Sequence, residues 1–143
     1  MKSSPNWAFL QRQDITNPEG EVYLRRWRVI QTPWFGMYLH NIRKPDHGRH
    51  LHDHPFGFLS LVLCGGYEEL TVNPIWEDFQ FAERVRWWSL KSPGMRGRHR
   101  ITRVLPNTWT LVFRGPYRHT WGFYTSEGFV QWQEYLAGSE VSS

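Results

Sequence analysis

The sequence predicts an all-β domain, a sandwich or barrel of short strands, and three observations support this. Aromatic residues make up 17 % of the 143 residues, and they favour strands and a lined interior. Twelve Gly and nine Pro are spread along the whole chain, as the turns between many short strands require. Helical periodicity is absent from any window longer than about ten residues. Because no linker or repeat divides the chain, we expect one domain over 1–143.

The expected strands follow one another closely. Residues 1–20 are polar and mixed, and we expect a segment that leads into the barrel and is held there by Trp7 and Phe9. The barrel itself is expected over 21–136, followed by a flexible tail at 137–143. Alternation and β-favouring side chains predict strands at 22–30, 34–42, 58–63, 67–72, 85–90, 98–104, 108–114, 119–124 and 129–135.

Glycine, proline and polar residues predict the connections between these strands. Residues 43–50 form a polar loop, and Gly65–Gly66 makes a tight hairpin turn between two strands. A longer excursion is expected over 73–82, and a Pro/Gly turn over 92–97.

Composition narrows the class of partner. The formal charge is +4, and 14 of the 17 basic residues are Arg, which grips carboxylates and phosphates bidentately. Nucleic acid is an unlikely partner, because the sequence has no Lys/Arg block and no nucleic-acid-binding motif. We expect no membrane association, because no apolar run approaches the roughly 18 residues of a spanning helix. The single cysteine excludes an internal disulfide, which favours a reducing, cytoplasmic setting.

Three of the seven histidines fall within five residues, at His50, His52 and His54. On a strand, residues two apart point the same way, so these rings can share one face while Asp53 faces the other. Two imidazoles on one face form half of a site for a first-row metal, and His99, after the Pro/Gly turn, is the best candidate for a third ligand. The alternative interpretation is a set of surface loop histidines.

Residues 52–66, HDHPFGFLSLVLCGG, resemble the first motif of the cupin superfamily, and residues 93–99, PGMRGRH, are similar to the second. The resemblance spans about residues 34–123 and implies a cupin-type double-stranded β-helix, a jelly-roll barrel. It departs from the family pattern at two positions. The family's glutamate ligand falls at Phe58, and an asparagine found in some members falls at Arg103.

The resemblance implies a divalent metal held by His52, His54 and His99 without a carboxylate. Three-histidine cupins include thiol dioxygenases, so Fe(II) is favoured, although imidazoles equally suit Zn, Ni, Mn or Cu. Four further residues are reserve ligands: His50, Asp53, His40 and His119.

Several residues are candidates for the substrate-binding pocket. Strand alternation places Arg103 on the same face as His99, and three arginines are candidates for gripping an anion: Arg103, Arg114 and Arg118. Tyr38 and Trp121 offer flat apolar walls, and Phe58 would keep the metal dry.

These features leave three hypotheses about function. The favoured one is a small, oxygenase-like metal enzyme acting on a compact anionic or aromatic molecule. The alternatives are a non-catalytic cupin whose metal orders the barrel, and a cupin-type isomerase or epimerase with a His base and a Tyr acid. By analogy with cupins, a homodimer that pairs sheet edges is expected.

Overall fold

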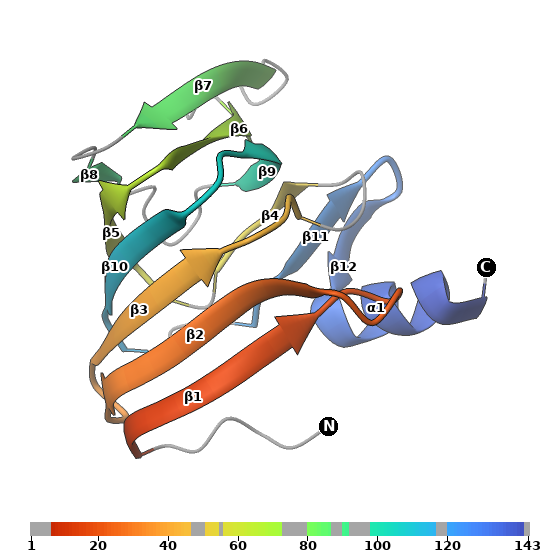
Figure 1. The fold of residues 1–143 in the computed structure, drawn as a ribbon. Helices are drawn as coiled ribbons and strands as arrows, with labels where there is room; N and C mark the ends of the chain where they lie inside the picture. Colours follow the sequence, from red (N-terminus) through yellow and green to blue (C-terminus); the bar gives the residue numbers. More distant parts are fainter. Residues whose placement is uncertain are drawn as a thin grey trace.

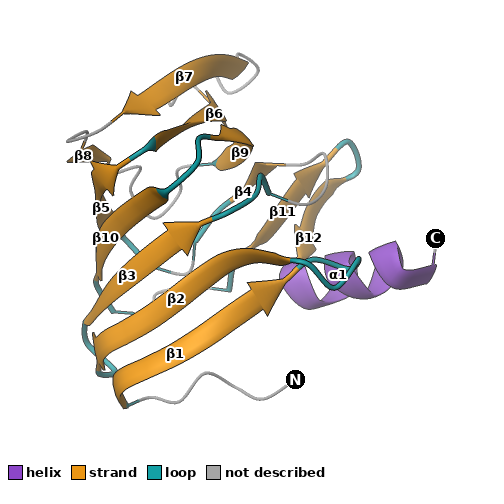
Figure 2. Cartoon of the chain, viewed as in Figure 1, coloured by secondary structure: helices purple, strands orange, loops and turns teal. Residues whose placement is uncertain are grey.

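The computed structural model describes residues 7–46, 51–54, 56–72, 80–86, 90–91, 98–116 and 120–141. Within these ranges the chain forms twelve strands and one helix (Figures 1 and 2). In chain order they are β1 (Ala8–Thr16), β2 (Val22–Gln31), β3 (Gly36–Ile42), β4 (Leu51–His52), β5 (Phe58–Cys64), β6 (Gly66–Val72), β7 (Gln80–Arg86), β8 (Leu90–Lys91), β9 (His99–Val104), β10 (Thr108–Arg114), β11 (Gly122–Thr125), β12 (Gly128–Gln131) and α1 (Trp132–Val141). None of the described helical residues forms a helix long and apolar enough to cross a membrane.

The strands form two antiparallel sheets of six strands each. The first has the order β1-β2-β3-β10-β5-β8, and the second has the order β12-β11-β4-β9-β6-β7. Strands that are distant in sequence are neighbours in both sheets: β10 lies between β3 and β5, and β4 lies between β11 and β9. This exchange of strands between two facing sheets is the jelly-roll arrangement that the sequence predicts.

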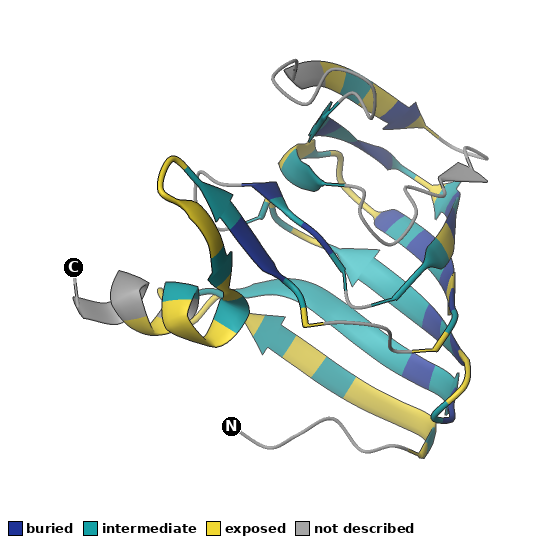
Figure 3. Cartoon of the chain, turned by 180° about the vertical axis from the view of Figure 1, so that it is seen from behind, coloured by how far each residue is buried: buried dark blue, intermediate teal, exposed yellow. Residues whose placement is uncertain are grey.

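The space between the sheets is partly apolar and partly polar. Val62, Tyr67 and Val85 form a buried hydrophobic cluster against which Ile42, Ile101 and Val104 pack. The other buried positions include many polar side chains: Arg28, Gln31, Ser60, Glu69, Thr108, Thr110 and Arg114. Burial follows the inner strands of both sheets, whereas most of β1 is exposed (Figure 3). An interior with so many polar groups suits a binding cavity better than a purely structural core.

Residues 8–16, for which no strand was predicted within the segment leading into the barrel, form the edge strand β1. It pairs with β2 from Ala8 to Thr16, and Gln11 and Gln13 accept hydrogen bonds from the Arg28 guanidinium at 2.9 and 2.6 Å. On this face the strand carries Gln11 and Gln13 before Ile15, so the usual apolar alternation is not visible in the sequence. Phe9 is 73 % exposed and does not hold the segment, whereas the 63 % exposed Trp7 stands edge-on to Trp34 with ring centroids 5.8 Å apart.

Two further elements differ from the prediction. Residues 80–86 form β7, where a loop to residue 82 and a strand from residue 85 were expected. The strand expected at 129–135 ends at Gln131, and the chain continues as α1 into the predicted tail. Aromatic stacking favours the helix: the Trp132 ring stacks on Trp121 with centroids 5.6 Å apart, and Tyr135 stacks on Phe123 at 3.9 Å. Residues three apart share one helix face, so α1 brings both rings at once to β11 and to Trp121, the residue before it.

Candidate metal centre

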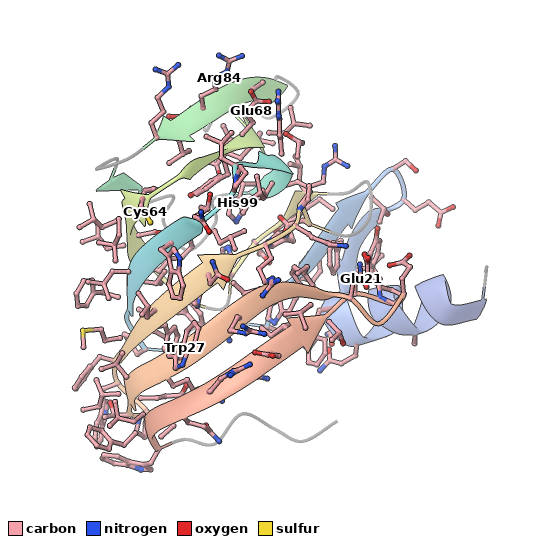
Figure 4. The ribbon with its side chains drawn as sticks, viewed as in Figure 1. Glu21, Trp27, Cys64, Glu68, Arg84 and His99 are labelled. Atoms are coloured by element: carbon pink, nitrogen blue, oxygen red, sulfur yellow. The ribbon has the colours of Figure 1, made fainter. Side chains whose placement is uncertain are left out.

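His52, His54 and His99 converge between the sheets, as the sequence predicts. His52 on β4 pairs directly with His99 on β9, and His54 follows two residues after His52. Each ring offers a nitrogen, and the three nitrogens lie within 4.8 Å of one another. The closest two are Nε2 of His54 and Nε2 of His99, which are 2.8 Å apart. Figure 4 labels His99 on its strand. Among the described residues, this is the cluster with the geometry of a metal site.

Asp53 points away from the histidine cluster, as strand alternation predicts. It is buried, and its Oδ1 accepts a hydrogen bond from the Gly122 amide at 2.9 Å. Its Oδ2 accepts one from the Tyr124 hydroxyl at 3.1 Å. Asp53 therefore ties β4 to β11 and lies outside the cluster for which it was a reserve ligand. The reserve ligands His50 and His119 lie outside the described residues.

Glu69 is a residue of the site that sequence reasoning missed. Its side chain is only 2 % exposed, and its Oε2 lies 2.8 Å from Nδ1 of His99. A carboxylate can only accept, so Nδ1 of His99 carries a proton, and Nε2 is the ring nitrogen left on the side of the cluster. A carboxylate that orients a ligand histidine in this way is common in metal sites. The available signal was alternation along β6, because an inward Tyr67 places Glu69 inward as well.

Burial keeps the imidazoles of His52 and His54 neutral. Desolvation lowers the pKa of His52 from 6.5 to about 4, although nearby Asp46 acts in the opposite direction. Desolvation also lowers the pKa of His54 well below 6.5, and the neighbouring His99 and His52 add to that shift. A metal ligand must be the neutral imidazole, so these two rings are in the required state at neutral pH.

Aromatic rings surround the cluster and shield it from water. Phe58 stands edge-on to His54 with centroids 4.7 Å apart, and Trp121 and Phe123 lie 6.1 and 5.8 Å from His52. Phe58 and Trp121, both candidates for the pocket lining, thus lie beside the histidines. Trp121 is in turn backed by Trp132 of α1.

Arg114 points inward, as one of the three candidate arginines should. It is 3 % exposed, and its Nε donates to the Tyr38 hydroxyl at 2.7 Å. Its terminal nitrogens donate to the carbonyl oxygens of Thr32 and Gly115 at 2.7 and 2.9 Å. The Tyr38 hydroxyl also donates to Gln31 at 2.8 Å, so Tyr38 belongs to a buried polar network and is not a purely apolar wall.

Arg103 does not point inward with His99, and that expectation is wrong. Its side chain is exposed, because a register shift interrupts the pairing of β9 with β6: Arg103 pairs with Glu68, whereas Ile101 pairs with Glu69. Thr102 is therefore an extra residue, a β-bulge that reverses the alternation after Ile101. Arg118 lies outside the described residues.

A different arginine, Arg26 on β2, lies in the interior near the histidines. Its Nε donates to Nε2 of His40 at 2.9 Å, and its guanidinium lies 5.3 Å from the centroid of the Tyr38 ring. Desolvation and then the Arg26 charge lower the pKa of His40 well below 6.5. His40, a reserve ligand, is thus held by Arg26 outside the three-histidine cluster. Alternation along β2 could have indicated Arg26, because it shares a face with the buried Arg28.

No protein-family model matches the sequence, and no curated protein matches it. Solved structures do match its fold. A cupin-2 domain from Rhodospirillum rubrum has a TM-score of 0.62 at 11 % identity, over 90 % of this chain and 84 % of that one. KdgF from Halomonas sp. has a TM-score of 0.55 at 17 % identity, over 78 % and 96 %. HppE with Fe(II) has a TM-score of 0.56 at 11 % identity, over 73 % and 55 %. The chain therefore has the cupin fold.

Proposed function

We propose that this cupin-fold protein binds one divalent metal ion through His52, His54 and His99 and acts as a metal-dependent enzyme on a compact small molecule. The observation that carries the proposal is the 2.8 Å separation of Nε2 of His54 from Nε2 of His99. Two imidazole nitrogens bound to one tetrahedral metal at about 2.1 Å are about 3.4 Å apart, so a small outward movement of the rings would fit the ion.

Fe(II) is the favoured metal, and Zn, Ni, Mn or Cu also suit three imidazoles. HppE, which shares the fold at low identity, has been solved with Fe(II). Such an ion, when bound, supplies Lewis acidity and open coordination positions for a chelating substrate or dioxygen. The protein's own residues fix the geometry: Glu69 holds the tautomer of His99, and Phe58 and Trp121 exclude water.

The groups beside the cluster favour an anionic or aromatic substrate. Arg26 brings a positive charge into the interior. Desolvation, His99 and His52 contribute more to the lowered pKa of His54, but the charge of Arg26 also contributes. Thr110 pairs with His40 across β10 and β3, and its buried Oγ1 has no hydrogen-bond partner among the described residues. We assign Arg26 to the substrate's negative charge, the Thr110 hydroxyl to a polar group, and the faces of Phe58 and Trp121 to an apolar part.

An isomerase mechanism with His40 as the base and Tyr38 as the acid is disfavoured. The Nε2 lone pair of His40 already accepts a hydrogen bond from Arg26. The Tyr38 hydroxyl accepts from Arg114 and donates to Gln31, so it has no proton to give a substrate without breaking that network. The cytoplasmic setting and the homodimer remain predictions.

Metal analysis of the purified protein tests the proposal. We expect about one divalent ion per chain, and loss of it in a His52→Ala, His54→Ala double variant, because one remaining imidazole is a poor site. Asp53→Asn is the matched control, since Asp53 lies between the two ligands in sequence but faces β11. Full occupancy in the double variant would contradict the site. Oxygen consumption with small anionic and aromatic compounds then separates an oxygenase from a non-catalytic metal binder.

A further inference from the structure

A hollow lies on the sheet that contains β6, β7 and β9, and none of the three clustered histidines lines it. Its volume is about 440 Å³. Charged side chains on its lining come from three strands: Arg84 and Arg86 from β7, Glu68 from β6 and Arg103 from β9. Figure 4 labels Arg84 and Glu68 at this edge of the molecule.

The strand register explains how these side chains gather. Glu68 pairs with Arg84 on one side and with Arg103 on the other, so the three stand in a row across the sheet. In the next row, Gly66 pairs with Arg86 and its carbonyl accepts a hydrogen bond from the Leu105 amide at 2.9 Å. Glycine is needed here because a Cβ at Gly66 would lie 2.6 Å from the carbonyl oxygen of Val85, so the backbones of β6 and β7 approach closely beside Arg86.

The row faces away from the histidines. On β6, Tyr67 and Glu69 are buried and Glu69 contacts His99, so the intervening Glu68 points to the opposite face. Arg103 reaches this outer face because of the bulge at Thr102. The irregularity that removes Arg103 from the metal site thus adds it to the outer hollow.

We propose that this hollow binds the phosphate group of a compact phosphorylated molecule. Three guanidinium groups and one carboxylate line it, a formal balance of +2. The carboxylate of Glu68 is 2.9 Å from Nε of Arg84. Guanidinium forks match phosphate oxygens bidentately, and the volume lies in the range of small-molecule sites, about 300–1,000 Å³. The half-exposed Leu105 supplies an apolar side for the rest of the ligand.

Substitution of Glu68 should change phosphate affinity in the opposite direction to substitution of the arginines. Glu68 competes with a bound anion for Arg84 and repels phosphate, so its neutral isostere should bind phosphate more tightly. Replacing either Arg86 or Arg103 by Ala removes an attractive charge and should weaken binding. For partly exposed charges we expect each substitution to change the dissociation constant by about threefold.

Titration of the metal-loaded protein with inorganic phosphate tests this, followed through the Nε–H signals of its arginines. We expect shifts at Arg84, Arg86 and Arg103, weaker binding in Arg86→Ala and Arg103→Ala, and tighter binding in Glu68→Gln. Arg12→Ala is the control, because Arg12 is exposed and ion-paired with Asp14 on the other sheet. Equal weakening in Arg12→Ala would show general surface attraction and overturn the proposal. So would loss of binding in the His52→Ala, His54→Ala variant, which would place the phosphate on the metal.

Discussion

Nδ1 of His99 lies 2.8 Å from Oε2 of Glu69, a carboxylate that is almost fully buried in the opposing strand β6. This contact determines which ring nitrogen of His99 is free to bind a metal. It also places a carboxylate beside the three imidazoles, without a carboxylate in the ligand set itself. The carboxylate of Glu69 would therefore act on a bound metal through His99, and not as a ligand itself.

Removing that carboxylate should weaken metal binding. We expect Glu69→Leu to lower metal affinity about 10- to 100-fold, because His99 loses its preferred tautomer and orientation. Competition with a chromogenic chelator measures the affinity. Glu68→Gln is the matched control: it is the adjacent residue on the same strand, faces outward and should leave metal affinity unchanged. Equal metal affinities for Glu69→Leu and the unmodified protein would show that Glu69 does not support metal binding.

The motif alignment predicts that Phe58 occupies the position of the family's glutamate, and its ring stands edge-on to His54. We expect Phe58→Glu to raise metal affinity by adding a charged fourth ligand, and to destabilise the metal-free protein because the carboxylate is then buried without a partner. Metal titration and urea unfolding with and without metal measure the two effects. Leu59→Glu, whose side chain is partly exposed, is the control. Unchanged affinity and coordination in Phe58→Glu would mean that the motif alignment is wrong by at least one residue.

The histidine cluster could be predicted because its geometry depends on local alternation. His52 and His54 are two residues apart, and His99 stands at the start of a strand, so no irregularity intervenes. Arg103 could not be placed correctly, because the bulge at Thr102 arises from pairing between β9 and β6, which the local sequence does not specify. Glu69 was missed for a related reason: its partner His99 is 30 residues away along the chain.

The two missed elements also depend on distant contacts. β1 has glutamines where a core-facing strand would have apolar residues, and its stability comes from Arg28 and from backbone pairing with β2. α1 has little amphipathic pattern, and its first turns are held by the stacking of Trp132 and Tyr135 on β11. Sequence periodicity reports an apolar face, and neither element has a simple one.

His40 should make the stability of the metal-free protein pH-dependent. Its folded-state pKa is depressed by desolvation and by Arg26, so the unfolded chain binds a proton below pH 6.5 that the folded chain does not. The contribution of His40 is therefore complete above pH 6.5 and is lost as the pH falls, by up to about 1.4 kcal/mol per pH unit. His52 and His54, whose pKa values burial also lowers, act in the same direction.

Urea unfolding between about pH 7.5 and about pH 5.5 measures this slope, with the limits chosen about one unit above and below the ordinary histidine pKa. The slope reports how many protons the chain takes up on unfolding. We expect this number to fall by about one in His40→Gln, because glutamine cannot titrate. An unchanged slope in that variant would show that His40 does not resist protonation in the folded protein.

Thr110 and Thr108 provide a matched pair for testing the interior pocket. Both are buried on β10, two residues apart and on one face. The Thr108 Oγ1 accepts a hydrogen bond from the Gly66 amide at 3.0 Å and lies 2.7 Å from the carbonyl oxygen of Leu105. The Thr110 Oγ1 has no partner among the described residues. A buried hydroxyl without a partner costs stability, and this cost is tolerated where a ligand is to be bound.

We therefore expect Thr110→Val to raise the free energy of unfolding by about 1 kcal/mol, and Thr108→Val to lower it by about 1–3 kcal/mol because the Gly66 amide loses its partner. Urea unfolding of both variants measures the difference in sign. Once a substrate is known, Thr110→Val should also bind it more weakly, while its metal content stays the same. If Thr110→Val destabilises the protein as much as Thr108→Val does, the hydroxyl has a structural partner and the pocket has no polar contact at this position.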